Sequence, residues 1–225
     1  MNKKYRVIYA DPPWYFKNFS EKGTGRNPVA HYDCMSIEDL SRLPIYKWAA
    51  KDCALFLWVT DPILDQAIEL IEDWGFKYKT VGFYWIKTNK KVDPEKMSKK
   101  SFFTGLGYWT RANPEQCLIA TRGAPPRKAK NIPRLLISPR REHSRKPDEV
   151  YNLIKKLCNG PYLELFARKT QKGWDSWGKE KKLFDNGVVS TRNRPSNMGR
   201  KNKKKKRIKR KINKKKSIKF KFLNK

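Results

Sequence analysis

The chain has 225 residues, of which 38% are apolar, enough to bury the core of one α/β domain but too few for two ordinary domains. Its formal charge of +32 is uneven: residues 199–225 carry 16 of the 53 Lys and Arg and no acid, and the other 37 bases face all 21 acids, which leaves +16. A charge of this size favours a polyanionic partner, of which nucleic acid is the commonest and an anionic membrane the alternative.

Other features of the composition exclude several classes of protein. There is no run of 18 apolar residues, and Lys3 and Lys4 precede only a strand-length apolar run without a cleavage-type site, so we expect a soluble intracellular protein. The cysteines form no CxxC pair, which predicts neither a zinc site nor a disulfide framework. The cysteines and histidines are Cys34, Cys53, Cys117, Cys158, His31 and His143.

Strand and helix patterns alternate along the chain. Arg6–Ala10 is a short apolar strand, and the continuous apolar run Ala54–Val59 predicts a strand buried on both faces. Asp61 as N-cap and Pro62 then begin a helix that ends at Gly75. Further strands are expected at Thr80–Ile86, Gln116–Ala120, Leu135–Ile137 and Tyr162–Ala167, with a helix from about Pro147 to Leu157. This alternation predicts a doubly wound α/β sheet, in which ligands bind at the carboxyl ends of the strands.

The tetrapeptide Asp11-Pro12-Pro13-Trp14 directly follows the first strand. The prolines restrict the backbone and supply no donors, so the carbonyls of Asp11 and Pro12 are expected to face outward. A carboxylate, a carbonyl and an aromatic ring suit a planar ligand with an exocyclic NH2 group, such as adenine or cytosine. The alternative is a strand-ending turn with a core Trp.

Two long irregular segments, Tyr15–Met35 and roughly Thr88–Thr110, are expected to be functional or disordered. The second interleaves aromatic and basic residues, a pattern typical of platforms that stack on unpaired nucleotides. Trp85 and Trp109 fit a core role equally well, whereas Phe102 and Phe103 are better substrate candidates because lysines surround them.

After about Asp185 the apolar periodicity is lost. We therefore predict a catalytic domain over residues 1–185 and a basic tail over residues 186–225, either disordered or helical only when bound. The tail suits a nonspecific DNA clamp, an RNA-binding arm or a nuclear-import signal.

The order of the segments resembles the DPPW-type adenine-N(6) methyltransferases, the family of the seventy-kilodalton messenger-RNA adenine methyltransferase subunit and its bacterial and phage DNA-modifying relatives. The resemblance covers most of residues 5–180. The matching segments are Asp11–Trp14, His31–Ser36, Leu55–Thr60, Trp85–Asn89, Gly107–Trp109, Glu115–Leu118, His143–Glu149 and Glu164–Arg168.

The resemblance implies an α/β fold, the Rossmann-like S-adenosylmethionine-dependent methyltransferase fold, with a mostly parallel sheet and a permuted motif order. The catalytic strand comes first, and the cofactor-binding strand Tyr162–Ala167 comes last. Glu164 would hold the cofactor's ribose or pair with Arg168, while Lys146 and His143 would lie near its methionine carboxylate. His143 also fits a helix-capping role. The other implied cofactor contacts are Tyr9, Ala10, Asp11, Phe166 and Arg168.

The implied chemistry is methyl transfer to the adenine amine. Asp11 and the carbonyl of Pro12 would each accept one N–H of the amine, Trp14 would stack on the base, and Tyr32 would close over base or cofactor. A paired base is out of reach, so it must be unpaired or flipped at a cost of a few kcal/mol. The catalytic set is Asp11, Pro12, Pro13 and Trp14, and the substrate set is Tyr32, Lys87, Asn89, Phe102, Phe103 and Trp109.

Three functions stay open at this point. A DNA adenine methyltransferase of bacterial or phage type is favoured, and the rivals are the same chemistry on RNA and a noncatalytic nucleic-acid-binding partner. Nucleic acid is the expected partner, without a membrane and with a homo- or heterodimer as an option. The expected location is the cytoplasm of a bacterium or phage-infected host, or the nucleus if the host is eukaryotic.

Overall fold

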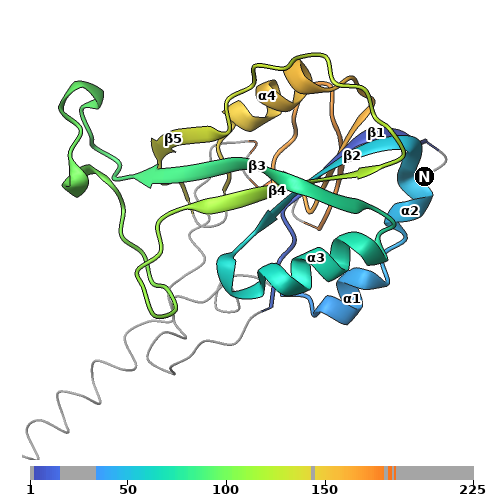
Figure 1. The fold of residues 1–225 in the computed structure, drawn as a ribbon, viewed down its shortest axis with the longest axis horizontal. Helices are drawn as coiled ribbons and strands as arrows, with labels where there is room; N and C mark the ends of the chain where they lie inside the picture. The colour runs from blue at the N-terminus through green and yellow to red at the C-terminus, as the bar shows by residue number, and fades with distance from the viewer. Residues whose placement is uncertain (1–2, 16–33, 143–144, 180–181, 184, 186–225) are drawn as a thin grey trace, which may run out of the picture. The chain divides into compact units, whose positions relative to one another are not determined.

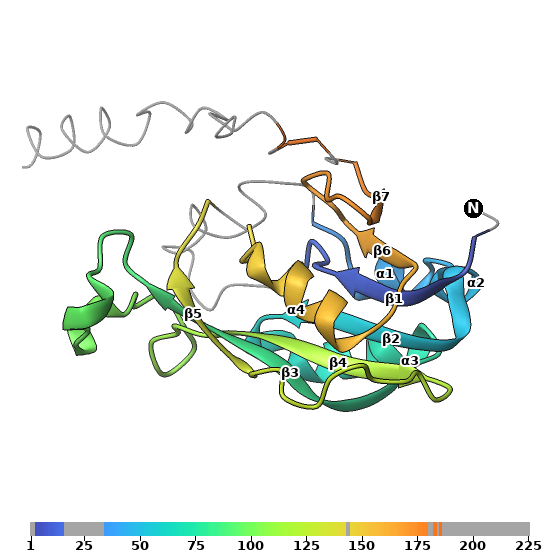
Figure 2. The same cartoon turned by 90° about the horizontal axis from the view of Figure 1, so that it is seen from above.

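A computed structural model describes residues 3–15, 34–142, 145–179, 182, 183 and 185. Within these ranges the chain forms one seven-stranded sheet with the strand order β5-β3-β4-β2-β1-β6-β7 (Figure 1 and Figure 2). The basic tail, His143, and the segment that contains Tyr32 lie outside the described residues. The strands are β1 (Tyr5–Ala10), β2 (Ala49–Val59), β3 (Lys77–Thr88), β4 (Glu115–Arg122), β5 (Leu135–Pro139), β6 (Tyr162–Leu165) and β7 (Asp175–Trp177).

The sheet is mostly parallel, as expected for a Rossmann-like methyltransferase fold. β1 pairs in parallel with both β2 and β6, and parallel pairing also joins β3 to β5 and β6 to β7. β4 runs antiparallel to both of its neighbours, β2 and β3. The periodicity predicted this strand but not its direction, because a strand buried on both faces has the same apolar pattern in either orientation.

The helices are short. They are α1 (Ile37–Ser41), α2 (Ile45–Trp48), α3 (Leu64–Asp73) and α4 (Glu149–Leu157), with 3-10 turns at Asp61–Ile63, Pro94–Lys96 and Lys99–Ser101. The start predicted for α3 needs one correction: Asp61 and Pro62 lie in a 3-10 turn that follows Thr60, and α3 itself begins at Leu64. The Asp61 carboxylate accepts a 2.9 Å hydrogen bond from Gln116. Gly75 ends the helix as expected, in the left-handed conformation at φ 79° that glycine adopts without strain.

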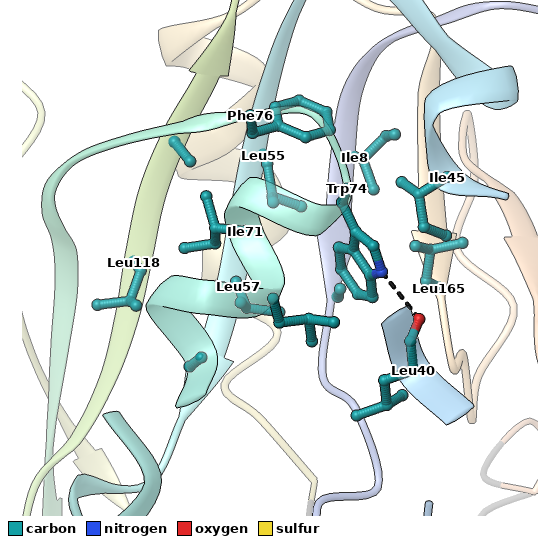
Figure 3. Close-up of a cluster of buried hydrophobic side chains, with 14 of the residues drawn as sticks. Ile8, Leu40, Ile45, Leu55, Leu57, Ile71, Trp74, Phe76, Leu118 and Leu165 are labelled. Carbon is teal, nitrogen blue, oxygen red and sulfur yellow. Dashed lines mark hydrogen bonds between the residues drawn. The ribbon is translucent and has the colours of Figure 1, made fainter. Parts of the chain in front are cut away.

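The helices cover both faces of the sheet (Figure 2). Alternate residues of β1 point to opposite faces, so Ile8 joins the apolar cluster under α1 and α3, whereas Tyr9 joins the cluster under α4. In the first cluster the Trp74 indole N–H donates a 2.9 Å hydrogen bond to the carbonyl of Leu40 (Figure 3). This bond ties the end of α3 to α1 and satisfies the buried ring nitrogen.

The permuted order has one consequence for function. β1 and β6 are far apart in sequence but adjacent in the sheet, with Ala10 opposite Leu165. Asp11 and Phe166, which directly follow these residues, therefore emerge side by side at the carboxyl edge of the sheet. This edge is where α/β folds bind their ligands.

None of the helices in the described ranges is long and apolar enough to cross a membrane. Nor does that part of the chain contain a group of three or more His, Cys, Asp or Glu arranged to hold a metal ion. The cysteines are free thiols.

Candidate active site

The turn after β1 is fixed by backbone hydrogen bonds. The carbonyl of Pro12 accepts a 2.8 Å bond from the N–H of Trp14, and the carbonyl of Pro13 accepts a 2.8 Å bond from the N–H of Met35. A third bond of 3.2 Å runs from the N–H of Tyr15 to the Met35 carbonyl. The prolines need no acceptors of their own, so the turn keeps one shape and holds Asp11 at its start.

Trp14 differs from the stacking role expected for it. Its side chain is only 5% exposed within the apolar cluster of α1 and α3, and its indole N–H donates a 2.9 Å bond to the carbonyl of Trp58. A ring enclosed in this way has no open face for a base. Trp14 is therefore a core residue that anchors the turn, which is the alternative that the sequence left open.

A pocket opens beside Asp11 and encloses about 430 Å³, part of it continuous with solvent. It contains most of the cofactor-contacting residues that the sequence predicted. Ala10 is not among its lining residues, because the side chain of Ala10 faces the opposite side of the sheet. The predicted residues in the lining are Tyr9, Asp11, Lys146, Glu164, Phe166 and Arg168.

The sequence reasoning missed four other lining residues: Arg145, Asp148, Tyr151 and Lys169. Arg145 and Asp148 lie within the matching segment His143–Glu149, so their proximity to Lys146 was a usable signal. Tyr151 lies on the buried face of α4. Only the packing of that helix against β6 places its hydroxyl in the pocket wall.

Asp11 lies in an ion pair at the pocket wall. Its Oδ2 is 2.7 Å from Nζ of Lys146, and the two side chains are 23% and 12% exposed. Burial raises the pKa of the Asp11 carboxyl above its ordinary value, while the positive charges of Lys146 and Arg168 act in the opposite direction. The pair borders the cavity, so the carboxylate is within reach of a ligand there.

Glu164 is a second buried carboxyl group in the same wall. It is 8% exposed, its Oε1 accepts a 2.8 Å hydrogen bond from the Tyr151 hydroxyl, and its Oε2 has no partner among the described residues. Burial, with a smaller effect from Asp11, raises the pKa of Glu164 to about 8, although the Tyr151 hydrogen bond lowers it. An unpartnered buried oxygen beside a cavity fits a ligand that donates hydrogen bonds, such as a ribose hydroxyl.

The loop after β6 is tightly built. Phe166 has a left-handed backbone with φ 59°, which is strained for a residue that is not glycine. Gly178 packs directly against this loop: a Cβ there would lie 2.9 Å from the N of Ala167. The Ala167 N–H also donates a 3.1 Å bond to the carbonyl of Trp177. Close backbone packing thus holds Phe166 at the pocket.

Cations gather around Asp148 at the rim of the pocket. Its carboxylate lies 2.8 Å from Arg141, 3.2 Å from Arg145 and 3.6 Å from Lys169. These cations lower the pKa of Asp148 against the effect of burial. Together with Lys146 and Arg168 they give the pocket the positive groups that a ligand carboxylate needs.

The predicted substrate residues occupy different environments. Lys87 forms an internal ion pair of 2.5 Å with Glu115 and is 17% exposed, so its ammonium is not directed at solvent. Asn89 donates a 3.0 Å hydrogen bond to the Lys100 carbonyl within its own loop. Phe102 is half-buried and bridges to Thr88, and the ring of half-buried Phe103 is covered by Arg140 at 4.7 Å.

Trp85 and Trp109 have opposite environments. Trp85 is 3% exposed in the core, whereas Trp109 is 107% exposed with a left-handed backbone of φ 60°. The loop that carries Trp109 is clasped at its base by Asn113, whose side chain bonds to the backbone of Lys87 and Phe103. Trp109 lies outside the pocket lining, so it is an exposed ring on an ordered loop rather than part of the pocket.

Comparison with known proteins agrees with this geometry. The profile of the MT-A70 family matches residues 5–180. The chain is 35% identical over 196 residues to the type II methyltransferase M.MunI of Mycoplasma sp, covering 79% of this chain and 78% of that protein. It is 29% identical over 182 residues to the human N(6)-adenosine-methyltransferase catalytic subunit METTL3, covering 79% of this chain but 28% of METTL3.

A third relative is a putative MT-A70-like N(6)-adenosine-methyltransferase of Medicago truncatula, 31% identical over 192 residues, covering 82% of this chain and 28% of that protein. The chain thus spans most of the Mycoplasma protein and under a third of the human and plant proteins. The family match covers the strands and the segments that build the pocket. The chain therefore belongs to the MT-A70 family of adenine methyltransferases, which act on nucleic acid with S-adenosylmethionine as methyl donor.

Proposed function

We propose that the protein methylates the 6-amino group of adenine in DNA, on a base that is flipped out of the duplex or already unpaired. One observation carries this proposal: the carboxylate of Asp11 borders the same cavity as Glu164, Lys146 and Arg168. One pocket thus holds an acceptor for the adenine amine together with groups that suit the nucleoside and amino-acid parts of the cofactor.

The cofactor fits the charges of the pocket. Oε2 of Glu164 would accept hydrogen bonds from the ribose hydroxyls, and Lys146 and Arg168 would pair with the methionine carboxylate. When bound, S-adenosylmethionine supplies an activated methyl group on a sulfonium sulfur. His143, which lies outside the described residues, remains a proposed contact of the same carboxylate.

The adenine amine would be held by Asp11 and Pro12. Asp11 accepts one N–H, and the carbonyl of Pro12 accepts the other through the lone pair that the Trp14 N–H does not use. These acceptors increase the electron density on the nitrogen as the new N–C bond forms and the S–C bond breaks. After transfer, the extra proton on the amine passes to the Asp11 carboxylate or to water. Pro13 and Trp14 act through the turn, by holding both acceptors in place.

DNA is favoured over RNA by sequence similarity. The chain is 35% identical to the type II methyltransferase M.MunI and 29% identical to the N(6)-adenosine-methyltransferase subunit METTL3. Trp109 adds an exposed ring suited to stacking on unpaired nucleotides. We assign residues 1–185 to the catalytic domain and the basic tail to nonspecific contacts with phosphates.

The test compares both substrates directly. Cofactor binding is measured by calorimetry, and transfer of a tritiated methyl group is then measured side by side on DNA and on RNA, each single-stranded and duplex. We expect transfer to DNA, and loss of transfer with retained cofactor binding in Asp11→Asn. Greater transfer to RNA than to DNA would identify RNA as the substrate. Cofactor binding without methyl transfer to DNA or RNA would indicate a noncatalytic partner. Near-parental activity of Asp11→Asn would refute the role of Asp11.

A further inference from the structure

Four charged side chains form a line that ends at Asp11. Lys87 lies 2.5 Å from Oε1 of Glu115, Nζ of Lys146 lies 3.3 Å from Oε2 of Glu115, and the same Nζ lies 2.7 Å from Oδ2 of Asp11. The residues come from β3, β4, the segment before α4 and the turn after β1. Each is at most 23% exposed, so solvent screens these interactions only weakly.

The pairing of Lys146 with Asp11 weakens the proposed hydrogen-bond acceptor of the adenine amine. Lys146 withdraws electron density from the carboxylate of Asp11, which the amine needs as an acceptor. A carboxylate that binds an ammonium by itself is a weaker hydrogen-bond acceptor than a carboxylate whose ammonium also contacts a second carboxylate. The enzyme therefore benefits if Lys146 moves away from Asp11 when cofactor and adenine are bound; its ammonium has three donors, so it can contact Glu115 and still pair with the methionine carboxylate.

Glu115 offers Lys146 a second partner. The 3.3 Å distance exceeds the roughly 2.8 Å of a strong charged hydrogen bond, so a shift of about half an ångström would complete the contact. Lys87 fixes the other oxygen of Glu115, so this carboxylate does not have to move. Burial tends to raise the pKa of Glu115, but Lys146 and Lys87 lower it to about 2, and the group is fully charged at neutral pH.

We propose that Glu115 is a positioning residue for methyl transfer: it draws the Lys146 ammonium away from Asp11 and leaves the Asp11 carboxylate available to the adenine amine. This inference rests on the proposed role of Asp11 as amine acceptor. The ring of Trp58 lies 5.6 Å from Nζ of Lys146 and stabilises the ammonium at the observed position. Lys87 acts one step further away, by anchoring Glu115.

The pH dependence separates this role from a purely structural one. The negative charge of Glu115 raises the pKa of Asp11, so its removal lowers that pKa and strengthens the pairing of Lys146 with Asp11. The acid limb of kcat/KM against pH should then move to lower pH while kcat falls. The other titratable groups that act on this cluster are Lys87, Arg168, Cys117, Tyr151 and Glu164.

The experiment uses the full chain with Glu115→Gln, and Asp39→Asn as a control that removes a carboxylate paired with Arg42 on the surface of α1. We expect kcat to fall about 100-fold in Glu115→Gln, as for a misplaced catalytic group, with cofactor affinity within about threefold of the parent and the acid limb at lower pH. Lys87→Gln should lose part of the activity and Lys87→Arg should retain it. Asp39→Asn should match the parent.

An unchanged kcat in Glu115→Gln, an unmoved acid limb, or a loss of cofactor affinity that accounts for the whole defect would overturn the inference. If Glu115→Gln does not fold, the two Lys87 variants provide the same comparison. An active parent with an equally active Glu115→Gln contradicts only this inference. A parent that transfers no methyl group to any nucleic acid contradicts the proposed function and this inference together.

Discussion

The hydroxyl of Tyr151 donates a 2.8 Å hydrogen bond to Oε1 of Glu164, on the buried wall of the pocket. The bond joins α4 to β6 and leaves Oε2 buried without a partner among the described residues. The pKa of Glu164, at about 8, means that this carboxyl group holds a proton at neutral pH in the folded, ligand-free protein. Stability and cofactor binding should both respond to this proton.

Stability should fall with rising pH through Glu164. The unfolded chain loses this proton near pH 4.3, whereas the folded chain keeps it to about pH 8. The stabilisation is therefore complete below the unfolded pKa and is lost as pH rises through the folded one. Between about pH 4.3 and 8 the parent should lose Tm relative to Glu164→Gln, measured by thermal unfolding. Parallel Tm profiles would contradict the pKa shift.

Gly178→Ala should damage the pocket through the backbone, because its Cβ would lie 2.9 Å from the N and 3.1 Å from the O of Ala167. We expect a loss of about 1–3 kcal/mol in the free energy of unfolding, with cofactor affinity about 10-fold weaker, equal to 1.4 kcal/mol. Gly75→Ala is the matched control, since it adds left-handed strain of about 1 kcal/mol at a site with nothing within 4 Å. Calorimetry should find normal affinity in the control, and equal losses in both variants would count against the packing argument.

Trp109→Ala should weaken nucleic-acid binding without lowering stability, because the side chain is fully exposed. The loss of one stacking platform should reduce affinity for single-stranded DNA about 10-fold, within the 1–3 kcal/mol typical of base stacking. Fluorescence anisotropy measures this affinity. Tyr46→Ala, which removes another exposed ring from α2, should bind like the parent. Equal affinities for parent and Trp109→Ala would exclude Trp109 from the interface.

Removal of the basic tail should reduce the salt dependence of DNA binding. If about half of the 16 bases in residues 199–225 contact phosphates, the log–log slope of the full chain includes a contribution near −7 from about 8 contacts. A chain that ends at Asp185 should show a slope that is flatter by about this amount. The measurement is a salt titration of affinity for one duplex. An unchanged slope would remove the clamp role of the tail.

Much of the fold followed from local patterns. The runs at Arg6–Ala10 and Ala54–Val59 identified β1 and the core of β2, and the pattern after Pro147 identified α4. β2 nevertheless begins at Ala49, five residues earlier, where Lys51 and Asp52 interrupt the apolar run. The short helices α1 and α2 and the three-residue strand β7 have too few residues for a detectable period, so packing decided them.

In the candidate site, too, some residues were predictable from the sequence and others were decided only by packing. The sequence predicted Asp11 and Glu164 from their positions at or beside strand ends and from the family resemblance, and both residues line the pocket. The stacking role predicted for Trp14 differs from its core position, and Trp109 was left between core and surface, because an aromatic residue in a turn or loop suits both environments. Only the contact of Trp14 with Trp58, and the absence of such cover on Trp109 among the described residues, separates the two.

The sequence by itself determined where most strands lie along the chain, the acceptor-rich turn at Asp11 and the basic character of the chain, because all three depend on neighbouring residues or on composition. The tertiary structure decided the direction of β4, the burial of Trp14 and the line of charges from Lys87 to Asp11. These features join residues up to 135 positions apart, as in the bond from Lys146 to Asp11. Their energies depend on distance and burial in the folded chain, which no local pattern records.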